Sequence, residues 1–527
     1  MWKIICKVFI VSSLWFLIAS NITSADRILM LMPTSFYSHQ IIFQSLCLAL
    51  SKRGHELTIV TSISLKDLIT KNYTEIYLAD LKHQTNEYID NSLEMKTSDL
   101  LKFAWKMSHR GSIETFNNSE FKEIYRHDSN KKFDAVILEV LCYPSLAVIA
   151  HRFNAPLIGL LPLGIHNYHR YLFGSPIFSS HPSNWELDVL VDENPSIWQR
   201  LWYFIDTWRL VYFWMNDYAT VEQEIVEKYL GNDVPSIIDV MKNMSLLLVN
   251  ENPVLAYPKP EQPNAIFFNG IHIQNPPPTL PKNLQQFLDD AMEGFIYVSF
   301  GTMATCRNLP KETLRNLVEV FSKLPYKIVW KFECDELPGK LDNAFISNWF
   351  LQQSVLAHPN IKLFIYQGGA QSTEEAVHYA VPILGIPTIF EQEKRVHRLV
   401  SFGVAECIQL NDLTKERLDS AIYQILDDKS YKEKMVYLSS LAKDQPYNNT
   451  ENVIWWIEFV MRHKGIDHLR FSDSDKPWYQ RYDMDIVALL ALTLFIMECV
   501  IALIVIKIIR FILNKTVLYS QHQMLKS

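Results

Sequence analysis

The stretch that decides the fold runs from Trp349 to Gln392 and reads WFLQQSVLAHPNIKLFIYQGGAQSTEEAVHYAVPILGIPTIFEQ. Within it, residues 362–365 (KLFI) predict a strand, the pair Gly368-Gly369 follows, and a helix-forming segment comes next. A strand, a glycine pair and a helix make a phosphate cradle, because glycine lets backbone N–H groups approach oxygen and the helix dipole favours an anion. The order therefore predicts an anion-binding site at the carboxyl end of a strand.

Three side chains of the same stretch would complete a nucleotide site. Ser372 lies in the first turn of the predicted helix and can donate to a phosphate, and Glu375 shares its helix face. A carboxylate there can accept both hydroxyls of a ribose, and the flat ring of Trp349 can stack on a base for roughly 1–3 kcal/mol. Ser372 and Glu375 are each also ordinary first-turn residues favoured by the dipole. It is their joint spacing that favours the site.

The rest of the 527-residue chain reads as two α/β domains and appendages. Strands alternate with helices in both halves, which predicts parallel sheets. A proline-rich stretch at 251–282 separates an N-terminal domain, 26–250, from a C-terminal domain, 283–480. Strands are expected at 27–32, 56–61, 135–140, 156–161, 295–299, 327–330 and 362–365, and helices at 41–53 and 311–322.

The 349–392 stretch resembles the signature of the UDP-glycosyltransferase family, with spacings that match without a gap. The resemblance covers nearly the whole chain and is greatest to insect members of the family. It includes the segments Ser38-His39-Gln40, Val298-Ser299-Phe300-Gly301-Thr302, Trp455-Trp456-Ile457-Glu458 and Arg462-His463-Lys464-Gly465. The resemblance implies an α/β GT-B fold, in which two Rossmann-like domains face each other across a cleft, the N-terminal one binding the acceptor and the C-terminal one the UDP-sugar. It also implies an inverting reaction without metal or cofactor, in which a UDP-sugar is a co-substrate and a small lipophilic hydroxyl compound is the acceptor.

The same resemblance implies roles for individual residues. His39, after the first strand, would be the general base, and Glu139 would orient it at a position where the family commonly has Asp. A single histidine after a strand is otherwise most often a structural residue. The residues expected to bind the UDP-sugar are Ser299, Gly301, Trp349, Gln352, Gln367, Gly368, Gly369, Ser372, Glu375, Glu391 and Gln392.

Four positions depart from the commonest family pattern and keep two alternatives open. Gln367 stands in place of His, Glu391 in place of Asp, Arg395 in place of Asn, and Leu351 in place of Pro. One alternative is an active transferase, with UDP-glucose the first expectation for the donor and UDP-glucuronate the second. The other is a weakly active or inactive homologue that binds UDP or lipophiles. Arg395 would favour glucuronate if it met the sugar, but Glu391 and Arg395 are four apart in the favourable order for a helical ion pair.

Both ends of the chain carry membrane signals. Residues 1–25 read as a signal peptide, with Lys3 and Lys7 before an apolar run. Residues 486–506 predict a transmembrane helix, and the basic tail 507–527 predicts a cytosolic end. These features predict a single-pass type I protein of the endoplasmic reticulum membrane, whose main body is luminal and whose span contacts lipid.

Composition excludes some partners and leaves others open. The formal net charge of −7 comes with no basic block, so nucleic acid is not an expected partner. The five cysteines between the signal and the span match no disulfide framework or metal pattern, and we expect mostly buried thiols. Four sequons fall in the body, and homo-oligomer formation stays open. The tryptophans at 198, 202, 208 and 214 indicate either helices covering the core or an acceptor-pocket or membrane-facing surface.

Overall fold

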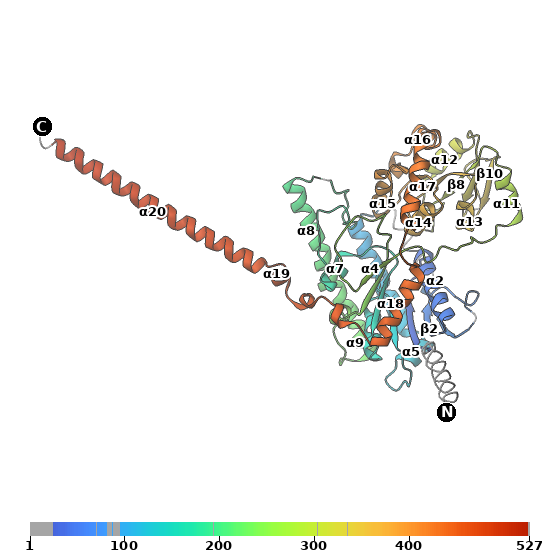
Figure 1. Cartoon of the computed structure of the whole chain (residues 1–527), viewed down its shortest axis with the longest axis horizontal. Coiled ribbons are helices and arrows are strands. Elements are labelled where there is room, and N and C mark those ends of the chain that lie inside the picture. Colours follow the sequence, from blue (N-terminus) through green and yellow to red (C-terminus); the bar gives the residue numbers. More distant parts are fainter. Residues whose placement is uncertain are drawn as a thin grey trace, which may run out of the picture. The chain divides into compact units, whose positions relative to one another are not determined.

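The computed structural model describes residues 25–69, 71–81, 87, 95–192, 194–302, 304–334 and 336–524. The expected signal peptide lies almost wholly outside these residues. The chain divides into two units, Met1–Arg470 and Phe471–Ser527. Figure 1 shows that the first unit, the body, contains two α/β lobes.

The first lobe is built on a seven-stranded parallel sheet of order β3-β2-β1-β4-β5-β6-β7. The sheet is parallel throughout because a crossover connection links each strand to the next, as the alternating sequence pattern predicted. The strands are β1 (Arg27–Met32), β2 (Glu56–Thr61), β3 (Tyr73–Tyr77), β4 (Ala135–Glu139), β5 (Leu157–Leu161), β6 (Leu246–Asn250) and β7 (Ala265–Phe268).

The second lobe carries a six-stranded parallel sheet of order β10-β9-β8-β11-β12-β13. Every residue of β8 is buried, as expected for a strand covered on both faces. The strands are β8 (Phe295–Ser299), β9 (Lys327–Lys331), β10 (Ala344–Ser347), β11 (Ile361–Tyr366), β12 (Ile383–Gly385) and β13 (Ala405–Cys407). The predicted strands of both lobes are confirmed to within a residue or two.

Helices cover both sheets. Those of the first lobe are α2 (Tyr37–Arg53), α4 (Thr97–Asn117), α5 (Ser119–Tyr125), α6 (Val148–Arg152), α7 (Asn167–Phe173), α8 (Ile197–Phe213), α9 (Ala219–Leu230) and α10 (Ile237–Lys242). Those of the second lobe are α11 (Lys282–Asp289), α12 (Lys311–Phe321), α13 (Gln352–Leu356), α14 (Ala370–His378), α15 (Phe390–Ser401), α16 (Lys415–Asp427) and α17 (Ser430–Lys443). Helix α2 begins at Tyr37 rather than at 41, so His39 lies in the first helical turn and not in a loop.

The proline-rich stretch is not a plain linker between the lobes. Its residues Ala265–Phe268 form β7, the edge strand of the first sheet, which pairs with β6. Prolines flank this strand without entering it, as the missing N–H requires. The first lobe therefore continues past residue 250.

The chain returns from the second lobe to the first at helix α18 (Asn449–His463). This helix follows the second lobe in sequence but packs in the core of the first. Val453, Ile457 and Val460 are fully buried there. At the edge of this contact, Glu458 accepts a 2.9 Å hydrogen bond from Nε of Arg53. Helix α18 therefore fastens the end of the body to its beginning.

The aromatic stretch before residue 225 is helical and covers the core, which was one of the two alternatives expected from the sequence. A π-helical turn, Trp214–Tyr218, joins α8 to α9. Trp214 is fully buried and stacks on Tyr168, with ring centroids 4.2 Å apart. Trp198 and Trp202 point outward instead, so this stretch has a core side and an exposed side.

The second unit contains α19 (Trp478–Arg481) and the long helix α20 (Met484–Met524). Within α20, Met484–Thr516 has a mean hydropathy of 2.9 over its most apolar window, which is apolar and long enough to cross a membrane. The helix continues beyond residue 506, where the sequence predicted the end of the span. The basic residues that follow do not break it, because Lys and Arg are good helix formers.

Candidate functional site

A cavity of about 330 Å³ opens between the two lobes of the body. Phe36, Leu100 and Trp105 line it from the first lobe, and Tyr297 and Phe350 from the second. His39 and every residue predicted to bind the UDP-sugar line this cavity, except Gly368. The structure thus collects in one place a set of residues that lie more than 350 positions apart in the sequence.

His39 and Glu139 form a hydrogen-bonded pair at the first-lobe wall of the cavity. Nδ1 of His39 lies 2.8 Å from Oε1 of Glu139. Helix α2 positions the histidine, and Glu139 is the last residue of β4, the neighbour of β1 in the sheet. Glu139 is fully buried, while the imidazole lines the cavity. Because Nδ1 faces the carboxylate, Nε2 is the nitrogen left to accept a proton.

On the opposite wall, Gln352 gathers two residues that were predicted to bind the nucleotide. Its Nε2 donates to Oγ of Ser372 at 3.0 Å and to Oε2 of Glu375 at 2.7 Å. Its Oε1 accepts a 3.2 Å hydrogen bond from the hydroxyl of Tyr297. Burial raises the pKa of that Tyr297 hydroxyl, so it stays a donor. Gln352 is therefore held in one orientation and holds Glu375 in turn.

The other oxygen of Glu375 is held by residues that the sequence did not single out. Nε2 of Gln353 donates to Oε1 of Glu375 at 3.1 Å and to the carbonyl of His272 at 3.1 Å. The His272 ring is fully buried, with Nε2 3.4 Å from the same Oε1. Desolvation lowers the pKa of His272, but the adjacent Glu375 and Glu374 carboxylates outweigh it and the net shift is upward. Only the position of Gln353 beside Gln352 could have indicated this role.

The residue before Glu375 on α14, Glu374, connects the two lobes. Glu374 accepts a 3.1 Å hydrogen bond from Nδ2 of Asn250 and another of 3.1 Å from the backbone N–H of Gly270. Burial raises the pKa of its carboxyl. Gln371 reaches the first lobe as well, donating to the carbonyl of Pro162 at 3.1 Å. Helix α14 thus presents Glu375 to the cavity and Glu374 to the first lobe.

Trp349 lies at the cavity mouth with neighbours from both lobes. Tyr37 meets its ring edge-on, with centroids 4.9 Å apart, and Nζ of Lys331 lies 5.5 Å from its centroid. Lys331 also donates to the carbonyl of Gly301 at 2.8 Å and pairs with Glu333. Tyr37 and Lys331 were not predicted. Their positions, two residues before His39 and at the end of β9, are the signals that could have indicated them.

The glycines of the predicted phosphate cradle follow the ends of β8 and β11. Gly301 and Gly368 both have positive φ, +68° and +100°. A Cβ on Gly301 would lie 2.4 Å from Nε2 of Gln367, and the left-handed φ of Gly301 itself favours glycine. The Gln367 amide oxygen is buried without a hydrogen-bond partner. Gly369 is the N-cap of α14, so the first N–H groups of that helix have no acceptor within the helix itself.

The residues expected to read the sugar lie at the start of α15. Oε1 of Gln392 accepts from both N–H and Oγ1 of Thr388, at 3.2 and 3.0 Å, which fixes the amide. Arg395 pairs with Glu391 one turn away and donates to the carbonyl of Gly368 at 2.6 Å. The segment is helical, and the ion pair expected from the spacing is confirmed. Arg395 lines a neighbouring hollow rather than the main cavity.

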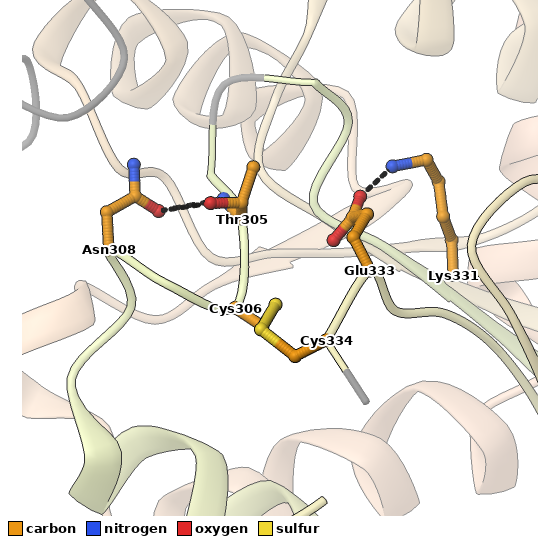
Figure 2. The surroundings of a disulfide bond; sticks show 6 residues. All are labelled: Thr305, Cys306, Asn308, Lys331, Glu333 and Cys334. Atoms are coloured by element: carbon orange, nitrogen blue, oxygen red, sulfur yellow. Dashed lines mark hydrogen bonds and ion pairs between the residues drawn. A yellow bond between two sulfur atoms is a disulfide. The ribbon is translucent and has the colours of Figure 1, made fainter. Parts of the chain in front are cut away.

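A disulfide between Cys306 and Cys334 lies beside the cradle, which corrects the expectation that the body cysteines are mostly buried thiols. It joins the loop after β8 to the chain after β9, and Figure 2 shows Lys331 and Glu333 on one side of it and Thr305 and Asn308 on the other. Cys47, Cys142 and Cys407 remain free thiols. The pairing was not readable from sequence because adjacent parallel strands bring together residues 28 positions apart.

These features define a class of protein. Two parallel α/β lobes enclose a cleft, glycines at two strand ends and the hydrogen-bonded Glu375 lie in the second lobe, and a His–carboxylate pair lies in the first. No cluster of three potential metal ligands occurs among the residues that the structure describes.

Solved glycosyltransferases share the architecture. The glycotransferase of kitacinnamycin aligns with a TM-score of 0.57 at 17% identity over 82% of this chain and 98% of that one. A UDP-glucose:anthocyanidin 3-O-glucosyltransferase bound to UDP aligns with 0.55 at 13% identity over 84% and 100%. The fold is that of a GT-B glycosyltransferase.

The family follows from sequence comparison. The chain belongs to the UDP-glucoronosyl and UDP-glucosyl transferase family, whose profile matches residues 27–523. It is similar to UDP-glucosyltransferase 2 of Dactylopius coccus, with 32% identity over 91% of this chain and 92% of the relative. It is also similar to human UDP-glucuronosyltransferase 2B15, with 27% identity over 94% and 93%. The chain is a UDP-glycosyltransferase, and its C-terminal apolar helix fits a membrane-anchored member.

Proposed function

We propose that this protein transfers glucose from UDP-glucose to a hydroxyl of a small lipophilic acceptor, with inversion at the anomeric carbon. The observation that carries the proposal is the 2.8 Å pair between His39 and Glu139 in the wall of the same cavity that the donor-site residues line. The first-lobe part of this cavity is largely apolar, with Leu100, Leu101, Ala104 and Trp105, which suits a lipophilic acceptor.

In the proposed reaction His39 acts as the general base. Glu139 accepts the Nδ1 proton, so the Nε2 lone pair can take the proton of the acceptor hydroxyl. The acceptor oxygen bonds to the anomeric carbon as that carbon's bond to the diphosphate oxygen breaks, and UDP leaves with the electron pair. Buried Glu139 stabilises the imidazolium, which afterwards loses its proton to solvent.

The second lobe supplies the proposed donor site. Trp349 would stack on uracil, Glu375 would accept the ribose hydroxyls with Gln352 beside it, and Ser372 would donate to phosphate. Ser299, Gly301, Gln367, Gly368 and Gly369 would surround the diphosphate, where fixed N–H groups stabilise the growing negative charge of the leaving group. Glu391 would accept hydrogen bonds from the hydroxyls of the sugar, and the amide nitrogen of Gln392 would donate to them.

Glucose is proposed over glucuronate because Arg395 already has partners. Its guanidinium is engaged by Glu391 and by the carbonyl of Gly368, and it lines a different hollow. A sugar carboxylate would have to compete with both contacts for the guanidinium. The similar insect protein whose name is UDP-glucosyltransferase 2 supports the same choice.

The test is to incubate the purified full chain with UDP-glucose or UDP-glucuronate and a mixed panel of phenols, and to measure UDP release. Proton NMR of the product then gives its anomeric configuration. We expect UDP release with glucose and a β-linked product, since the donor is α-linked. An α-linked product would contradict single displacement. Tight UDP binding without release across the panel would instead indicate an inactive binding homologue.

The proposed location is the membrane of the endoplasmic reticulum, with the body in the lumen. Three basic residues, Lys507, Arg510 and Lys515, follow the most apolar part of α20, which favours a cytosolic C-terminus. All four sequon asparagines, 72, 117, 243 and 448, are exposed, and a disulfide suits an oxidising lumen. Endoglycosidase H should shift the mobility of the protein, and in sealed microsomes external protease should spare the body. Digestion of the body would reverse the orientation.

A further inference from the structure

The segment 270–274 follows β7, the last strand of the first sheet, and is hydrogen-bonded to the helices that carry the proposed donor site. The carbonyl of His272 accepts from Nε2 of Gln353 on α13 at 3.1 Å. The backbone N–H of Gln274 donates to Oε1 of the same Gln353 side chain at 2.8 Å. The connection between the lobes is therefore fixed to the side chain that also holds Glu375.

The ring of His272 lies between two neighbouring carboxylates of α14. Its Nε2 is 3.4 Å from Oε1 of Glu375, and its Nδ1 is 3.8 Å from Oε2 of Glu374. The ring has no exposed surface, and neither nitrogen makes a hydrogen bond of good geometry, so the contact is one of charge. In the part of the chain that the structure describes, His272 is the one basic residue within ion-pair distance of either carboxylate.

Two adjacent buried carboxylates need a counter-charge if both are to stay ionised. Burial and a nearby like charge each favour the neutral form of a carboxyl group. The neutral form carries a proton on one oxygen and accepts fewer hydrogen bonds, whereas Glu375 is proposed to accept both ribose hydroxyls. An imidazolium at His272 supplies the counter-charge. Desolvation lowers the pKa of His272, but Glu375 and Glu374 outweigh it and the net shift is upward, which agrees with this charge.

His272 does not line the cavity, so its charge can reach a nucleotide there only through Glu375. We propose that His272 is a positioning residue for the donor, and that its charge beside Glu375 makes the site select ribonucleotides over 2′-deoxyribonucleotides. This role rests on the proposed nucleotide pocket, because without Glu375 at the ribose the histidine would have no influence on the choice of nucleotide.

Calorimetric titration of the full chain with UDP and with 2′-deoxy-UDP measures this role as the ratio of two dissociation constants. The wild type should bind UDP roughly tenfold more tightly, because the deoxy sugar lacks one hydrogen bond to a charged acceptor. His272→Gln keeps a polar side chain and removes the charge. It should reduce the ratio to about threefold or less, mainly by weakening UDP, since a hydrogen bond to a neutral acceptor contributes less.

Two further variants control for folding and for a general loss of a buried histidine. His272→Asn is a second neutral variant with a shorter amide, for use if the first does not fold, and the same reduced ratio is expected. The matched control is His358→Gln, because His358 is also a buried histidine with a carboxylate partner, Asp289 at 3.1 Å, and does not line the cavity. His358→Gln should keep the wild-type ratio. Circular dichroism checks that the variants are folded alike.

The charge account makes one more demand. His272→Gln/Glu374→Gln lacks the second carboxylate, so Glu375 no longer needs a counter-charge, and the ratio should return towards that of the wild type. A double variant with no more preference for UDP than His272→Gln would overturn the proposal. So would neutral variants of His272 that weaken both nucleotides equally and keep the wild-type ratio, which would mean a purely structural role.

Glu375→Ala separates the role of His272 from the pocket itself. This variant should bind the two nucleotides about equally, because the acceptor for the ribose hydroxyls is gone. If the wild type already bound UDP and 2′-deoxy-UDP equally, and Glu375→Ala changed neither affinity, the pocket would be wrong and the role of His272 would fall with it. If Glu375→Ala removed the preference while His272→Gln kept it, the pocket would stand and the role of His272 alone would be overturned.

Discussion

Gln352 and Glu375 lie on different helices, α13 and α14, and are joined by a 2.7 Å hydrogen bond from Nε2 to Oε2. A second hydrogen bond, from Gln353, holds the other carboxylate oxygen. The acidic group proposed to bind ribose is thus fixed before any nucleotide arrives, which removes part of the ordering cost of binding.

The proposed nucleotide pocket predicts the effect of two substitutions on UDP binding. Glu375→Ala removes the acceptors for the ribose hydroxyls, and Trp349→Ala removes the stacking surface, so each should weaken affinity by roughly 1–3 kcal/mol, about 5- to 160-fold. Calorimetric titration of the full chain with UDP measures this. Trp455→Ala, another exposed tryptophan, is the control and should bind normally. Unchanged affinity in both test variants would remove the pocket from the account.

The disulfide predicts a link between oxidation state and donor binding. It closes a loop of 28 residues and joins the segments that carry Gly301 and Lys331, so its loss should destabilise the folded second lobe by about 3–4 kcal/mol. We expect Cys306→Ser/Cys334→Ser to unfold at lower temperature and to bind UDP several-fold more weakly. Cys407→Ser removes a free thiol and serves as the control. Equal UDP affinity in the test and control variants would show that the bridge does not support the donor site.

Substituting Gln367 by histidine is expected to maintain or raise turnover rather than lower it. Its amide lies against Gly301 beside the proposed diphosphate site, and a neutral amide cannot carry positive charge. Gln367→His would add charge where the leaving group becomes more anionic, so turnover should stay the same or rise. Steady-state UDP release, compared with the conservative Gln367→Asn, measures the effect. A folded but inactive histidine variant would mean that the loop shape has been rebuilt around glutamine.

Arg395 predicts how the donor preference responds to mutation. Because its guanidinium is already paired with Glu391 and Gly368, Arg395→Asn should leave the ratio of UDP-glucose to UDP-glucuronate use within about twofold of wild type. The two donors compete at equal concentration, and the products are separated by chromatography. A wild-type preference for glucuronate that the substitution abolishes would reverse the proposed order of donors.

Much of the fold was predictable because local signals and tertiary packing agree. The strands 27–32, 56–61 and 295–299 are apolar runs bounded by turn residues, and all three have the predicted bounds. The start of α2 was misplaced because Tyr37 and Ser38 carry no capping signal, and Phe36 caps the helix without a side-chain hydrogen bond. The return of α18 to the first sheet was not predictable, since no local pattern says which sheet an apolar helix covers.

Part of the candidate site was likewise predictable from the sequence, and part was not. The cradle and Glu375 lie on one continuous motif, so spacing alone brings them together. Tyr37, Lys331 and His272 come from three distant segments whose convergence depends on the packing of the two lobes. The His39–Glu139 pair depends on the order of the sheet, which places β4 beside β1 and which the sequence did not specify.

The most direct test of the account is the turnover of His39→Ala with UDP-glucose and the best phenol of the panel, measured beside calorimetric UDP binding. We predict a loss of roughly 10² or more in turnover with UDP affinity unchanged, because the base acts on the acceptor and not on the nucleotide. Glu139→Gln should lose less, and His463→Ala, an exposed histidine of α18, should lose nothing. Near-normal turnover in His39→Ala would contradict the proposed mechanism.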